Sequence, residues 1–145
     1  MPTGRKWSRK DTIAGLAILS AVFGYWFAVH YPGFLSYRDR TAGKVAIKNA
    51  DAIRIGLTKY AESIGCRCYP SELASYEAVR NLVNQHGVNL PDKQREAGFT
   101  EIIYKLKTPK SFQLIVGIDR IGSGSDQYIF CTLEKCTSVK EKPTL

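Results

Sequence analysis

The sequence predicts an α+β protein in which an N-terminal transmembrane helix continues into an amphipathic helix packed on a small antiparallel β-sheet. Three patterns indicate this: residues 12–29 carry no charge, residues 44–64 repeat apolar side chains at helical spacing, and residues 102–107 and 112–118 alternate apolar and polar side chains. The chain has 145 residues, of which 44% are hydrophobic and 23% charged. It is therefore long enough for one folded domain in addition to a membrane helix.

The N-terminal apolar run is long enough to cross a bilayer. A hydrocarbon core about 30 Å thick requires about 20 residues of helix, and the uncharged run that starts at Thr12 extends to Tyr37. A cleaved signal peptide is the alternative, but the run is long for one and no Ala-x-Ala site follows it. We expect a basic flank at residues 1–11 and a transmembrane anchor at residues 12–37.

Residue types that favour the membrane interface lie at both ends of this run. The dense basic charge before it favours a cytoplasmic N-terminus, although basic residues also follow it from Arg38 onward. We therefore expect a single-pass protein of the cytoplasmic (inner) membrane with a periplasmic or extracellular C-terminal domain. The expected interface residues are Arg5, Lys6, Arg9, Lys10, Trp26 and Tyr31.

Small side chains within the anchor suggest packing against other helices. Gly15, Ala17, Ala21 and Gly24 are small enough to let a second transmembrane helix approach closely. The expected partners are the lipid bilayer and other membrane-protein subunits, contacted through the anchor and through the exported domain.

The exported α+β domain is expected at residues 38–136. A helix over residues 44–64 is predicted from one apolar face, and Gly65 is a natural stop. A short second helix is predicted from about residue 73 to Gly87, followed by a loop at residues 89–98. The apolar face of the first helix consists of Ala46, Ala50, Ile53, Leu57, Tyr60 and Ile64.

The second half of the domain has the period of β-strands. Residues 102–107 and 112–118 alternate apolar and polar side chains around a turn at Thr108, Pro109 and Lys110, and a third strand is expected at residues 128–133 after a loop at 119–126. Short connections favour an antiparallel meander, in either three or four strands. One face of such a sheet needs cover, which the helix at 44–64 can supply. Residues 137–145 are expected to form a polar tail.

Four cysteines fit an exported domain that carries disulfides. Cys131 and Cys136 are spaced for a small loop, and we prefer that pair. Cys66 and Cys68 are separated by one residue, so they either stay together or reach the other pair. A four-thiolate zinc site is the alternative, but its usual C-x-x-C spacings are absent.

Catalytic patterns are missing from the sequence. There is no nucleophile elbow and no phosphate-binding loop, and the two histidines, His30 and His86, fall at predicted helix ends. The spread of basic residues and the lack of any recognition motif argue against nucleic-acid binding. We expect no enzyme and no cofactor. Calcium between Asp119 and Asp126 is a second metal hypothesis, against ordinary turn residues.

The order of elements resembles a type IV pilin or a type II secretion pseudopilin. The likeness is carried by a proline in the hydrophobic helix followed by FLSYRDR at residues 34–40, by LTKYAES at 57–63 leading to CYP at 68–70, and by SFQLIV at 111–116. It covers nearly the whole chain. It implies a noncatalytic, membrane-anchored subunit that makes structural protein contacts in a pseudopilus or pilus.

Two departures from the family pattern keep other functions open. Aligning Pro32 with the family's helix proline puts the processing site near Lys10, where no glycine precedes it, and puts Gly15 where the family has a glutamate used in assembly. An accessory structural subunit of a larger respiratory or photosynthetic membrane complex is therefore the first alternative. A membrane-tethered metal or redox sensor that uses the four cysteines is the second.

Overall fold

The structure, a computed structural model, describes residues 9–118 and 127–144. The chain divides into two compact units, Met1–Tyr37 and Arg38–Leu145, which are described separately below. Helix α1 (Arg9–Ser63) contributes to both units, and the second unit adds α2 (Tyr76–Gln85). Together with the four strands of the second unit, these helices confirm the α+β class. The helix predicted at residues 44–64 is the C-terminal part of a helix of 55 residues.

The first unit is the N-terminal part of α1 and has no core of its own among the described residues. Pro32 lies inside the helix. Because proline has no N–H, the Ala28 carbonyl loses its usual helical donor at that point.

The second unit contains one antiparallel sheet. Its strands, in spatial and sequence order, are β1 (Phe99–Thr108), β2 (Ser111–Ile118), β3 (Tyr128–Cys131) and β4 (Cys136–Val139). Each strand pairs with the next; for example, Tyr104 lies opposite Leu114. This is the predicted meander, and its first hairpin turns where the sequence places Pro109 and Lys110.

The end of the sheet differs from the sequence prediction. The third strand stops at Cys131 rather than at residue 133, and residues 137–139, expected in a polar tail, lie in β4. Cys131 and Cys136 are direct partners across these two strands. A short edge strand exposes much of its surface, so it needs no apolar alternation that a sequence pattern could reveal. The loop predicted at residues 119–126 lies outside the described residues.

One stripe of α1 supplies the helical part of the core. Ala46, Ala50, Ile53 and Leu57 are completely buried, as predicted, and the stripe continues to Ala61, which is 3% exposed. Tyr60 is only half-buried and Ile64 is 38% exposed, so the predicted face is wrong at its C-terminal end. Ile64 lies one residue beyond the end of α1 at Ser63, so helical spacing no longer sets the direction of its side chain.

Strand β2 is one of the two interior strands of the sheet and is buried on both faces. The predicted inward positions, Phe112, Leu114 and Val116, are at most 1% exposed and belong to the main core, as does Ile118. Ile115 points to the opposite face and is also completely buried, although its strand neighbours Ile103 and Phe130 are only half-buried. Strand β2 thus has little exposed surface on either face.

Helix α2 begins later than the sequence suggested because a serine caps it. The Ser75 side chain accepts a hydrogen bond from the Ala78 N–H, so the helix starts at Tyr76 rather than near residue 73. Tyr76, Val79 and Val83 are buried in the core. At the other end, His86 is the C-cap, as expected, and its ring packs edge-on against Tyr60.

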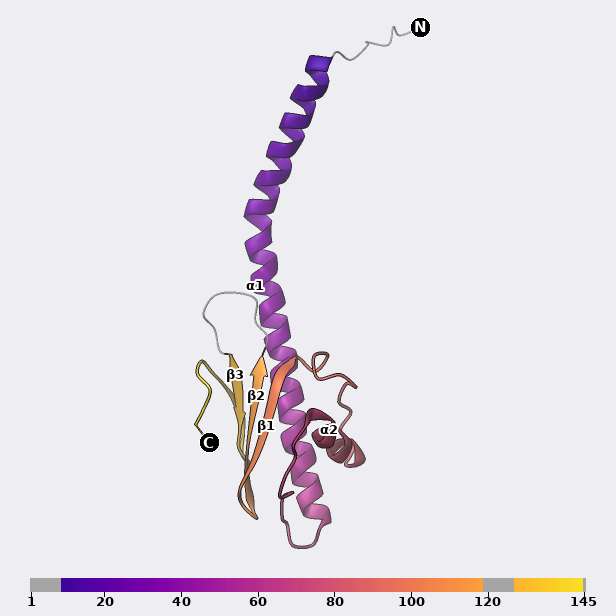
Figure 1. Cartoon of the computed structure of the whole chain (residues 1–145), viewed down its shortest axis with the longest axis vertical. Helices are drawn as coiled ribbons and strands as arrows, with labels where there is room; N and C mark the ends of the chain where they lie inside the picture. Colours follow the sequence, from indigo (N-terminus) through magenta and orange to yellow (C-terminus); the bar gives the residue numbers. More distant parts are fainter. Residues whose placement is uncertain (1–8, 119–126, 145) are drawn as a thin grey trace. The chain divides into compact units, whose positions relative to one another are not determined.

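Helices α1 and α2 approach each other closely at Gly56. A Cβ at this position would lie 2.6 Å from the Val83 Cβ and 3.0 Å from Val88 Cγ2. Both neighbours are stiff, β-branched side chains, so neither can move aside without disturbing the core. The sheet and α2 both flank this part of α1 (Figure 1).

Side-chain hydrogen bonds join α1 to the segment before β1 and to the β3–β4 turn. Asn49 Nδ2 donates to the Ala97 carbonyl at 3.0 Å, and Arg54 donates both to Asp51 and to the Leu133 carbonyl in the β3–β4 turn. Next to Ala97, Gly98 has φ +84° and packs on Ala46, which suits a residue without a side chain.

We predict that residues 38–145 fold without the first unit. Their core is drawn from α1, α2 and the sheet and lies within this unit alone. The isolated fragment should be monomeric by sedimentation and should show helical and strand signals with cooperative unfolding by circular dichroism. A fragment that is unfolded under oxidising conditions would contradict this.

We predict that Gly56→Ala destabilises the domain by about 1–3 kcal/mol, since the added methyl overpacks the Val83 contact. Urea unfolding of the full-length protein measures the change. Gly24→Ala is the matched control, because nothing lies within 4 Å of a Cβ there. Equal stability of the two variants would show that α1 and α2 do not pack as described.

Candidate functional site

The first unit presents an apolar surface that nothing within the unit covers. By length and composition, α1 is the one helix among the described residues that can cross a membrane, and the apolar stretch that qualifies it is 0% buried. Such a surface is costly to expose to water. The large exposed side chains on it are Ile13, Leu16, Ile18, Leu19, Val22, Phe23, Tyr25, Trp26, Phe27, Val29, Tyr31, Phe34 and Tyr37.

The small residues predicted to pack against a partner do not all share one face. At about 100° per residue, Ala17, Ala21 and Gly24 fall on one side of the helix. Gly15 is nine residues from Gly24 and therefore lies about 180° away. Gly15 therefore does not share the helix face of the other three small residues.

The helix instead carries a longer stripe of small residues. Ala14 and Ala28 complete the face formed by Ala17, Ala21 and Gly24, since successive members are three or four residues apart. At Gly24 an added Cβ would have no neighbour within 4 Å, so another helix has room to approach.

Aromatic side chains gather toward the C-terminal part of the apolar run. Trp26 packs against His30 with ring centroids 5.1 Å apart, and Phe27 stacks on Tyr31 at 4.6 Å. Among the predicted interface residues, Arg9 and Lys10 are exposed in the first turn of α1, whereas Arg5 and Lys6 lie outside the described residues.

The four cysteines lie in two pairs at disulfide distance, both within the second unit. Cys131 pairs with Cys136, the preferred prediction, and Cys66 pairs with Cys68, one of the two options left open. Cys131 is completely buried, whereas Cys66 is exposed. The two pairs therefore differ sharply in their access to solvent.

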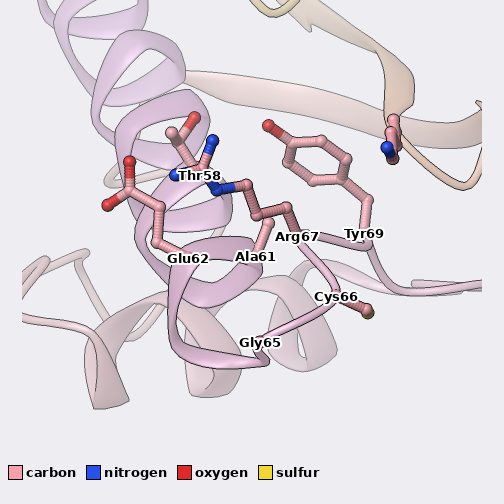
Figure 2. Close-up of a pocket in the computed structure, with 8 residues that line it drawn as sticks. Thr58, Ala61, Glu62, Gly65, Cys66, Arg67 and Tyr69 are labelled. Carbon is pink, nitrogen blue, oxygen red and sulfur yellow. The ribbon is translucent and has the colours of Figure 1, made fainter.

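A polar hollow of about 570 Å³ opens where α1 ends and the Cys66–Cys68 loop begins. Figure 2 shows the Arg67 side chain extending back along α1 toward Thr58, with the Tyr69 ring on the other side of the opening. The Tyr69 N–H donates to the Pro109 carbonyl at 2.9 Å, which brings the β1–β2 turn to the same place. The lining residues are Thr58, Ala61, Glu62, Gly65, Cys66, Arg67, Tyr69 and Lys110.

This hollow was not predicted from the sequence. Its charged side chains come from segments more than forty residues apart, and only the fold brings Lys110 to Arg67. One local feature is the backbone of Arg67, whose φ of 53° is rare for a residue with a side chain.

Tyrosine hydroxyls fasten the loops around the core. Tyr104 donates to the Pro70 carbonyl and Tyr76 to the Pro91 carbonyl, each at 2.7 Å. Burial raises the pKa of both hydroxyls above the usual value, strongly at Tyr104; at Tyr76 the Arg80 charge partly offsets the rise.

The described residues hold no group of three or more His, Cys, Asp or Glu side chains that could bind a metal ion. Asp119 and Asp126, the calcium candidates, lie outside the described residues, so the calcium hypothesis stays a prediction.

Comparison with known proteins gives no match: no family model, no curated protein and no solved structure is significantly similar to this chain.

We predict that the domain loses stability above about pH 10, the pKa of a tyrosine in the unfolded chain. Because the folded pKa of Tyr104 is raised, the unfolded state releases its proton first, and stability falls as pH rises through this range. Tyr104→Phe should lower the free energy of unfolding by about 1 kcal/mol at pH 8, because a hydrogen bond is lost. The variant should nevertheless lose less stability than the native protein when the pH is raised above about 10.

Urea unfolding at pH 8 and at pH 11 checks this. Tyr25→Phe, a change in the other unit, should leave the alkaline loss as in the native sequence. The same pH dependence with and without Tyr104 would show that its hydroxyl is not buried.

Proposed function

We propose that this chain is a noncatalytic, single-pass membrane subunit of pilin-like design. Residues 12–37 anchor it, and the domain that starts at Arg38 makes structural contacts with other proteins in a membrane-associated assembly such as a pseudopilus or pilus.

The apolar, uncovered surface of α1 is the observation that carries the proposal. Its first part exposes large hydrophobic side chains in every direction, while its later part exposes charged side chains and buries one stripe. A lipid environment accounts for the first pattern and water for the second.

The arrangement of the second unit supports the pilin-like part of the proposal. One helix whose apolar stripe packs on a four-stranded antiparallel meander, with a cysteine pair at the last strands, is the order of elements that the resemblance implies. The basic N-terminal flank favours a cytoplasmic N-terminus, so this domain is proposed to be periplasmic or extracellular.

Contacts within the membrane are proposed to run along the small-residue stripe. Leucine at Ala17, Ala21 and Gly24 keeps the helix hydrophobic but widens the face that a neighbouring helix would meet.

We predict that the Ala17→Leu, Ala21→Leu, Gly24→Leu variant reaches the membrane but no longer co-purifies with its partners. Membrane fractionation followed by affinity purification in mild detergent measures both steps. Gly15→Leu, on the opposite side of the helix, is the control and should co-purify as the native protein does. Normal co-purification of the triple variant, with loss in His86→Ala, would place the essential contact in the domain instead.

The second candidate is an accessory subunit of a larger membrane complex. It is favoured because Gly15 stands where the pilin family has the glutamate used in assembly. The intact mass of the protein isolated from membranes separates the two. Loss of about ten residues supports a processed pilin-like subunit, in line with the family's cleavage before the hydrophobic helix, and an intact N-terminus supports the accessory subunit.

A further inference from the structure

We propose that Cys66 and Cys68 form a redox-active disulfide that exchanges with small anionic thiols received in the adjoining polar hollow. This activity is independent of the anchoring function. It rests on the accessibility of this pair, on the backbone between the two cysteines and on the charges beside them.

Accessibility separates the two cysteine pairs. Exchange requires a thiolate to reach a disulfide sulfur. Cys66 is exposed and Cys68 half-buried, whereas Cys131 is completely buried inside the sheet and Cys136 is its neighbour on the adjacent strand. An attacking thiol can therefore reach Cys66 without any opening of the core.

The backbone between Cys66 and Cys68 favours opening of the ring. Arg67 has φ 53°, a left-handed conformation that is disfavoured for a residue with a Cβ, and Gly65 just before it has φ 40°. The bond between the flanking cysteines confines Arg67. Once the bond opens, Arg67 is free to return to a more favourable conformation.

The charged residues that line the hollow indicate which kind of thiol it would bind. Arg67 and Lys110 line it, and neither side chain has an ion-pair partner among the described residues. Two cations favour a thiolate over a thiol and attract carboxylates. Glu62 also lines the hollow, and its carboxylate can pair with an ammonium group of the ligand. A volume of about 570 Å³ suits a small molecule, so a peptide-sized thiol with carboxylate and ammonium groups fits this chemistry.

The exchange runs in two balanced steps. The incoming thiolate attacks Cys66 Sγ, the Cys66–Cys68 bond breaks, and Cys68 leaves as a thiolate. A second thiolate attacks the ligand sulfur of the mixed disulfide, which releases Cys66 as a thiolate and the ligand as its own disulfide. Two ligand thiols are oxidised, the protein pair is reduced, and the two cysteine thiolates take up the two protons that the ligands released.

The test follows the two pairs in one molecule. Full-length protein in detergent is incubated with glutathione, quenched by alkylation at intervals and mapped by peptide mass. Cys66–Cys68 should open at least about tenfold faster than Cys131–Cys136, because only the first pair is accessible. Equal rates, or opening by a protein dithiol with glutathione inert, would overturn the proposal.

Two further arms test the named residues. The Cys68→Ser variant keeps only Cys66 of this pair, and the Cys66→Ser variant keeps only Cys68. Oxidised glutathione should form a mixed disulfide faster with the first variant than with the second. The reverse order would contradict attack at Cys66. Arg67→Gln and Lys110→Gln should each lower the glutathione rate relative to the cationic thiol cysteamine by about twofold to tenfold. Lys105→Gln, which removes the same charge away from the hollow, should not. An unchanged ratio in all three variants would refute recognition of an anionic thiol.

Discussion

Helix α1 carries two different side-chain patterns along its 55 residues. From Ile13 to Tyr37 its large hydrophobic side chains are exposed, and from Ala46 onward one narrow stripe is buried while the other faces are mostly polar. A helix in lipid needs apolar side chains all round, whereas a helix at the surface of a domain needs them on one side. The change in pattern near Arg38 coincides with the boundary between the two compact units.

The second unit is organised around the buried stripe. The side chains of Ala46 and Ala50 are small, and Gly98 packs directly on the helix at Ala46. On another side of the helix, Gly56 lets α2 approach closely. The larger side chains of Ile53 and Leu57 belong to the same core cluster as Phe112, Leu114 and Val116 of β2. Stability therefore depends on small residues at contact points as much as on large ones in the core.

The elements that could be predicted from the sequence are those with a strong helical or strand periodicity of apolar side chains. The stripe from Ala46 to Leu57 and the alternation from Phe112 to Ile118 each follow from one local pattern, and both are confirmed. The position of strand β4 was not predicted, because a short edge strand carries little apolar signal and residues 137–139 were expected in a polar tail. The polar hollow could not be predicted, since Arg67 and Lys110 line it only because the β1–β2 turn is hydrogen-bonded to Tyr69.

The central claim is that lipid, and not water, surrounds the N-terminal part of α1. Trp26 is 57% exposed in the protein alone, so its surroundings report on this directly. In a Trp7→Phe variant, Trp26 is the sole tryptophan, and its fluorescence can be measured after reconstitution into lipid vesicles. The account predicts quenching by lipids brominated near the headgroups and protection from aqueous iodide. Free quenching by iodide, with no effect of the brominated lipids, would contradict it.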